Sequence, residues 1–134
     1  MLTMPILSMD RIESFVRNVL GCQCPDEVFQ RIETTQQQQG SLRYQRILIG
    51  RRLLVYLLLP SAGKDALADF SDLVRHGLDE RDRNGWNRCR IALFGDVEGI
   101  FGAEMEAVFN RVAGGDPKMH LHRLSETQLT IDPD

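Results

Sequence analysis

The sequence predicts an α/β fold, a mixed sheet of four to five strands in which a β-hairpin is followed by strand, helix, strand, helix and strand. Two runs of strand-forming residues, 42–49 and 52–59, are joined by Gly50-Arg51, a connection that is typical of a hairpin. After the hairpin, segments with helical spacing alternate with short apolar runs, as in parallel sheets. A length of 134 residues fits a single domain, 1–134.

Three long helices complete this prediction, because apolar residues recur at helical spacing in three segments. The predicted helices are 10–20, 66–77 and 101–112, followed or ended by Gly21, Gly77 and Gly114. Residues 79–87 are charged, so we expect a polar loop there, with Trp86 packing on the core as an anchor.

The strand order follows from the handedness of the crossovers. Right-handed crossovers place strand 88–94 beside 52–59 and strand 118–124 beyond it, with both crossover helices on one face. Helix 10–20 is then the natural cover for the opposite face. Residues 53–59 are apolar on both sides, which predicts a central strand that is covered on two faces.

Two polar segments are less defined. The glutamine-rich residues 32–39 fit either an edge strand or a loop, and the sequence does not decide between them. Residues 125–134 are polar enough to form a loose tail. Strand 118–124, or a strand at 32–39, would leave an exposed sheet edge at which a second copy could pair, giving a homodimer.

Composition and charge exclude several classes of protein. The chain is 43% hydrophobic and 26% charged, which excludes wholesale disorder and fibrous repeats. Its formal net charge of −3 is too mild to indicate obligatory binding to nucleic acid or a membrane. Neither the N-terminus nor the longest apolar run, 53–59, has the pattern of a signal peptide or a bilayer span. Three cysteines form no secreted disulfide framework, so we expect a bacterial-type cytoplasmic protein.

The first candidate site is a metal centre made of two residue pairs. Cys22 and Cys24 offer two thiolates, while His120 and His122 alternate along a predicted strand and therefore project from the same face. Two thiolates and two imidazoles suit a tetrahedral zinc ion. This site requires that folding bring the two ends of the chain together.

The same cysteines allow a thiol-redox interpretation. Cys24 precedes Pro25, which is expected to open a short helix, and a helix N-terminus favours a thiolate. Cys22 would then be the resolving thiol. Asp26 and Glu27 oppose the shift electrostatically, and a disulfide across one residue is expected to be strained.

The other candidate is an anion site. Ligands of open parallel sheets collect at the carboxyl ends of the strands, and there Gly63 and Lys64 begin the helix after residues 53–59. Asp65 follows where a phosphate loop of nucleotide hydrolases has Ser or Thr, which excludes that activity. An arginine stripe across three strands is the alternative anion surface, for a phosphate-containing ligand or RNA. Its members are Arg43, Arg46, Arg51, Arg52, Arg88 and Arg90.

No arrangement of residues indicates a catalytic mechanism. Neither a Ser-His-Asp order nor a pair of carboxylates at catalytic spacing stands out. The catalytic residues are therefore unknown, and we expect a binding module rather than an enzyme. The three hypotheses are a zinc-binding module, a module that binds an anionic partner, and a thiol-redox protein.

Overall fold

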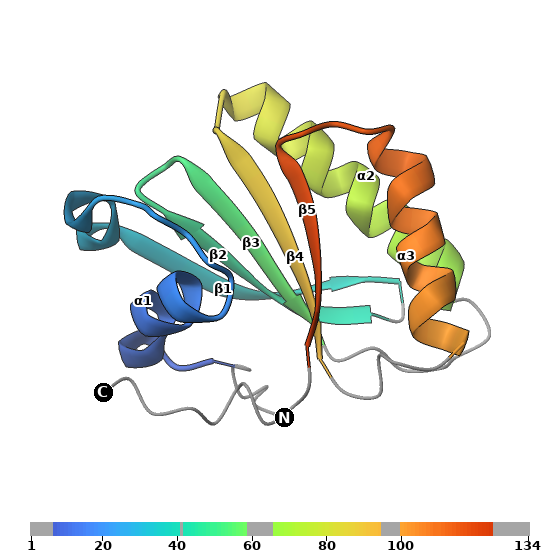
Figure 1. Ribbon diagram of the computed structural model, residues 1–134, viewed down its shortest axis with the longest axis horizontal. Helices are drawn as coiled ribbons and strands as arrows, with labels where there is room; N and C mark the ends of the chain where they lie inside the picture. The colour runs from blue at the N-terminus through green and yellow to red at the C-terminus, as the bar shows by residue number, and fades with distance from the viewer. Residues whose placement is uncertain (1–6, 41, 59–65, 95–99, 125–134) are drawn as a thin grey trace.

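A mixed β-sheet lies at the centre of the computed structural model, which describes residues 7–40, 42–58, 66–94 and 100–124 (Figure 1). Within these ranges the strands are β1 (Ile32–Gln39), β2 (Leu42–Ile49), β3 (Leu53–Leu58), β4 (Arg88–Phe94) and β5 (Met119–Leu124). The helices are α1 (Met9–Asn18), α2 (Ala66–Asn84), α3 (Ile100–Ala113) and the short 3₁₀ helix η1 (Asp26–Gln30). The five described strands lie in the order β1-β2-β3-β4-β5.

The strand pairing confirms the predicted architecture. β2 pairs antiparallel with β1 and β3, whereas β3, β4 and β5 run parallel. The register places Ile49, Leu53 and Arg88 side by side at one end of the three strands β2, β3 and β4, and this end is called an edge of the sheet below. Consequently, the end of one hairpin strand meets the beginnings of two parallel strands at this edge.

The glutamine-rich segment is a strand, β1, which answers the question that the sequence left open. It pairs with β2 along its whole length, from Ile32 opposite Ile49 to Gln39 opposite Leu42. On one face, the Gln45 side chain donates a hydrogen bond of 2.9 Å to the Thr34 hydroxyl. The β2 ladder therefore satisfies the backbone of a sequence that has few apolar residues of its own.

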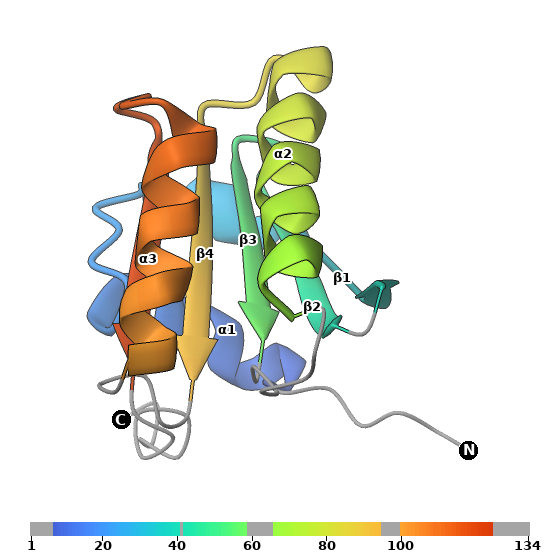
Figure 2. The same cartoon turned by 90° about the vertical axis from the view of Figure 1, so that its right-hand side faces the viewer.

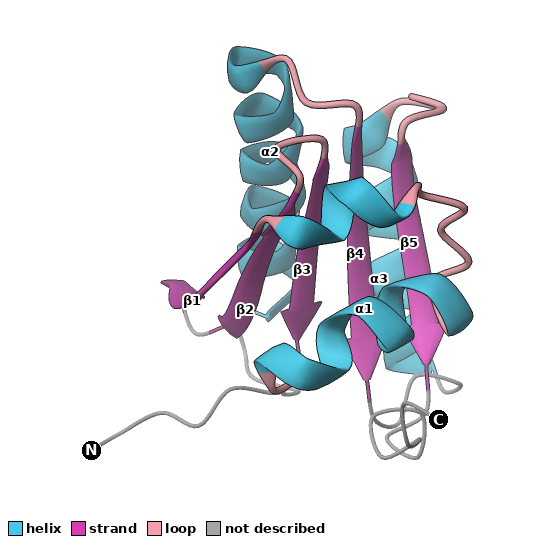
Figure 3. Ribbon diagram, turned by 90° about the vertical axis from the view of Figure 1, so that its left-hand side faces the viewer, coloured by secondary structure: helices cyan, strands magenta, loops and turns pink. Residues whose placement is uncertain are grey.

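Two apolar layers sandwich the sheet. Helices α2 and α3 lie side by side on one face (Figure 2), and α1 lies across the other (Figure 3). The first layer contains Tyr56, Phe70 and Ile91 and the second contains Phe15 and Phe94, so side chains alternate between them along each strand. All of β3 is buried, as expected for a strand that is covered on both faces.

The predicted end of the second helix at Gly77, and the predicted polar loop at 79–87, were wrong. Helix α2 continues to Asn84, and Gly85, with φ +69°, follows it. Gly77 is needed for close packing, because a Cβ atom there would lie 3.0 Å from the Tyr56 ring and 3.1 Å from the Cys89 sulfur. The glycine thus marks a close approach between helix and sheet and not a helix end.

Two of the charged residues after Gly77, Glu80 and Arg81, face inward from α2, whereas Asp79, Asp82 and Arg83 are exposed. The Glu80 carboxylate accepts hydrogen bonds from the Arg46 guanidinium at 2.6 Å and from the Tyr56 hydroxyl at 2.6 Å. Arg46 also lies over the ring of Trp86, which packs against the core as predicted. Buried partners therefore explain why a strongly charged sequence is helical.

Among the described helices, none has the length and apolar character needed to cross a lipid bilayer. The predicted tail at 125–134 lies outside the described residues.

Candidate functional site

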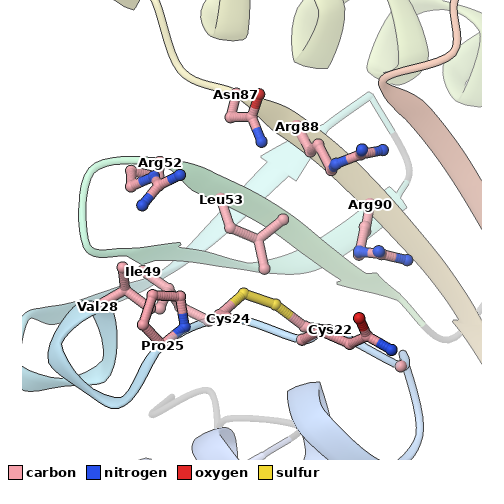
Figure 4. Close-up of a pocket in the computed structure, with 12 residues that line it drawn as sticks. Cys22, Cys24, Pro25, Val28, Ile49, Arg52, Leu53, Asn87, Arg88 and Arg90 are labelled. Atoms are coloured by element: carbon pink, nitrogen blue, oxygen red, sulfur yellow. A yellow bond between two sulfur atoms is a disulfide. The ribbon is translucent and has the colours of Figure 1, made fainter.

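A cavity of about 380 Å³ lies between the loop after α1 and the edge of the sheet where β3 and β4 begin (Figure 4). Its volume is in the range of small-ligand sites. The residues that give it chemical character are Cys22, Cys24, Arg52, Leu53, Arg88 and Arg90. The cavity is thus at the amino ends of the parallel strands, opposite to the edge at which ligands were expected.

One arginine holds the loop in place. Arg17, in the last turn of α1, donates to the Cys24 carbonyl oxygen at 3.0 Å and to the Asp26 carboxylate at 2.6 Å. Its guanidinium also lies 4.4 Å from the centre of the Phe29 ring. The Cys22 amide donates to the Val16 carbonyl oxygen at 3.1 Å. These contacts fix the loop from both sides.

Cys22 and Cys24 are joined by a disulfide bond. The loop brings the two Cα atoms to 5.4 Å, which allows the bond across one intervening residue. The expected position of Cys24 at a helix start was wrong by one residue, because Pro25 is the N-cap of η1. Both sulfur-bearing residues are partly exposed and line the cavity.

Arg90 is a partly buried cation of the cavity wall. One of its terminal nitrogens donates to the Leu20 carbonyl oxygen at 3.1 Å and contacts His122 Nε2 at 3.1 Å. Its Nε atom is buried and has no hydrogen-bond partner among the described residues. Burial lowers the pKa of Arg90, and the neighbouring charge of Arg88 lowers it further. Arginine nevertheless remains a cation at neutral pH.

Two further arginines share this wall. Arg88 contacts His120 Nε2 at 2.8 Å and donates a longer bond of 3.4 Å to the Pro117 carbonyl oxygen. Arg52 belongs to the turn between β2 and β3 and is exposed. The ion pairs found within the described ranges include none of Arg52, Arg88 and Arg90. The cavity wall therefore carries positive charge that no carboxylate in these ranges neutralises.

The two histidines do not add to this charge. Burial lowers the pKa of His122 to about 4, with a further contribution from Arg90, and burial and the same arginine lower the pKa of His120. Both rings are therefore neutral near pH 7. Since a guanidinium has no acceptor, each Nε2 atom accepts the hydrogen bond and Nδ1 carries the proton.

The predicted metal residues are not assembled as a metal centre. Within the described parts of the chain, no group of three or more His, Cys, Asp or Glu side chains could hold an ion. The sulfurs of Cys22 and Cys24 are bonded to each other, so neither is a thiolate ligand. The imidazoles of His120 and His122 point their Nε2 atoms at the two arginines of β4. The structure gives no support for zinc binding.

The predicted anion residues are divided among several places. Gly63 and Lys64 lie outside the described residues. Arg43 is exposed on β2 beside Tyr44, which pairs with Leu58 at the edge opposite to Arg88. Together with the pairing of Arg46 to Glu80, this placement breaks up the predicted stripe. Only Arg52, Arg88 and Arg90 of its members line the cavity.

One feature of the sequence could have predicted arginines at the amino ends of β3 and β4, where the cavity lies. Arg52 directly precedes β3 and Arg88 begins β4, and parallel pairing of the two strands brings their first residues together. The loop at residues 21–25 is held by hydrogen bonds from Arg17 to residues seven and nine positions further along the chain, and no helix or strand pattern predicts these contacts.

Comparisons of the chain with protein-family models, with curated proteins and with solved structures found no match. Function is therefore inferred from the chemistry of the cavity.

Proposed function

We propose that the protein binds a small organic anion, bearing a carboxylate or phosphate group, in the cavity formed by Arg52, Arg88 and Arg90. The observation that carries this proposal is three arginines on one cavity wall with no carboxylate partner in the described ranges. Guanidinium groups bind carboxylate and phosphate through paired N–H donors. A ligand anion would supply the negative charge that the described residues around these arginines do not.

The burial of Arg90 strengthens this attraction. An anion about 4 Å from a cation gains about 1 kcal/mol in water but about 4 kcal/mol at the effective dielectric near a protein surface. Arg90 also has the buried Nε donor without a described partner. Because Nε is shielded from solvent, an anion in the cavity would meet the terminal nitrogens of Arg90 and not Nε.

The remaining walls favour a ligand with an apolar part. Val28, Ile49 and Leu53 line the side of the cavity that faces the second apolar layer. The three arginines gather around one cavity, two from β4 and one from the turn before β3, which favours a small molecule over RNA.

Calorimetric titration of the purified protein with propionate and with inorganic phosphate tests the proposal. Arg88→Gln and Arg90→Gln should each weaken binding about tenfold or more, because a hydrogen bond to a charged group contributes about 1.5–3 kcal/mol. Arg43→Gln is the matched control, since it removes the same charge from the opposite edge of the sheet. Equal loss in the control and cavity variants, or no binding of either anion, would overturn the proposal.

A further inference from the structure

We propose that Cys22 and Cys24 are a redox-active pair whose disulfide exchanges with a small anionic thiol held by the cavity arginines. This inference rests on the proposed function, because the same arginines bind the carboxylate of the thiol. It adds a covalent step to binding and names the substrate class.

The position of the disulfide supports a reactive role. Both half-cystines line the cavity, and Figure 4 shows their sulfur–sulfur bond on the loop side, facing Leu53 and the cavity arginines. The third cysteine is a contrast within the same chain. Cys89 is fully buried against α2, and burial raises the pKa of its thiol to about 12, which keeps it inert.

A purely structural role explains this disulfide poorly. The two cysteines are two positions apart in the sequence, so the bond closes a very small loop and removes little entropy from the unfolded chain. The same loop is already fixed by the hydrogen bonds of Arg17 to Cys24 and Asp26. The disulfide therefore adds little constraint to a loop that Arg17 already holds.

Charge favours the chemistry at this place. Attack on a disulfide proceeds from a thiolate and releases a second thiolate, so nearby cations stabilise both the incoming and the leaving group. Arg52, Arg88 and Arg90 supply cations on the opposite wall. The acid closest in sequence, Asp26, is paired with Arg17.

The exchange balances in two steps. The thiolate of the first substrate molecule attacks one cysteine sulfur, a mixed disulfide forms, and the Cys22–Cys24 bond breaks to leave a thiolate on the other cysteine. A second substrate thiolate attacks the substrate sulfur of the mixed disulfide and releases the protein. Two substrate thiols thus lose two electrons and two protons and become a disulfide, while the protein gains both as a dithiol.

Three thiols of similar size and different charge test this inference: 3-mercaptopropionate, 2-mercaptoethanol and cysteamine. The rate of protein reduction is followed by alkylation with iodoacetamide and mass spectrometry, and Cys89 in the folded protein should stay unlabelled. Each rate is divided by that of the same thiol with a small reference disulfide, which removes differences in thiol pKa. The normalised rate should be about tenfold higher for the anion than for the cation, because a cationic cleft concentrates anions.

Matched variants assign this preference to the cavity. Arg52→Gln and Arg90→Gln should reduce it, and Arg43→Gln should leave it unchanged. The exposed Arg52 side chain has no hydrogen bond or ion pair among the described residues, so Arg52→Gln should fold normally. It therefore keeps the test valid even if Arg90→Gln is unstable. Cys24→Ser should abolish the exchange while the protein still binds propionate.

Two results would overturn the inference and are distinguishable from failure of the binding proposal. The first is propionate binding in calorimetry together with normalised thiol rates that are independent of charge, which leaves anion binding standing. The second is a Cys22–Cys24 pair that stays reduced in excess 3,3′-dithiodipropionate. Absence of both propionate binding and charge preference would instead remove the binding proposal along with the redox step.

Discussion

The arginines that pack against or lie on α2 have different partners from the two β4 arginines that line the cavity, although Arg17 of α1 is itself paired with Glu13 and Asp26. On the α2 face, Arg46 is paired with Glu80, and Arg81 with Asp82 and Asp116. On the α1 face, Arg88 and Arg90 contact neutral histidines and carbonyl oxygens. Each face has one buried arginine nitrogen without a described partner, on Arg81 and on Arg90. The two sets of arginines therefore differ in whether a carboxylate pairs with them, and not in whether every nitrogen has a partner.

This difference separates stability from binding. A half-buried ion pair is already satisfied, so its arginine holds elements together and has little left for a ligand. An arginine that contacts only neutral acceptors keeps its charge for an incoming anion. We therefore expect substitutions on the α2 face to alter folding and substitutions in the cavity to alter ligand affinity.

The largest effect is expected for Glu80→Ala. Its carboxylate has hydrogen bonds to Arg46 and Tyr56, so removal leaves a half-buried cation and a buried hydroxyl without their acceptor. The free energy of unfolding should fall by about 3 kcal/mol in urea denaturation. A loss below about 1 kcal/mol would show that this pair is merely a surface ion pair.

The second effect concerns stabilisation by anions. With propionate at 100 times its dissociation constant, the free energy of unfolding of the wild-type protein should rise by about 2.7 kcal/mol. The same propionate concentration should raise that of Arg88→Gln much less, and that of Arg43→Gln as much as wild type. A rise of equal size in Arg88→Gln would mean that the anion binds elsewhere.

A smaller effect is expected from pH. The folded-state pKa of His122 is lowered to about 4 from an ordinary value of 6.5, so the unfolded chain binds the proton first. The contribution of the neutral His122 ring to the free energy of unfolding is therefore fully present above pH 6.5 and is lost as pH falls toward 4. Between pH 7 and pH 5, wild type should lose about 1 kcal/mol more than His122→Gln, allowing for solvent screening of a partly exposed ring. Parallel losses in the two proteins would contradict this pKa.

The smallest effect on folding is expected for Arg88→Gln without ligand. Its side chain stabilises no carboxylate in the described ranges, so the free energy of unfolding should change by no more than about 0.5 kcal/mol. Urea denaturation of Arg88→Gln and Glu80→Ala under the same conditions compares their free energies of unfolding directly. A loss as large as that of Glu80→Ala would show that Arg88 is structural.

The sequence predicted the fold better than the site. Hairpin chemistry at Gly50 and the right-handed crossovers were sufficient for the strand order. Gly77 misled because a glycine needed for close packing on Tyr56 has the same local pattern as a helix end. The cavity escaped prediction because Arg17, through the Cys24 carbonyl and Asp26, fixes the loop that forms its wall.

The most direct test of uncompensated charge is to observe the arginine side chains themselves. In a ¹H–¹⁵N NMR titration with propionate, the Nε–H signal of Arg90 should shift in a saturable way, while those of Arg46 and Arg81 stay in place. Equal shifts of all three signals, or an Arg90 signal that stays unchanged at saturating propionate, would contradict the account.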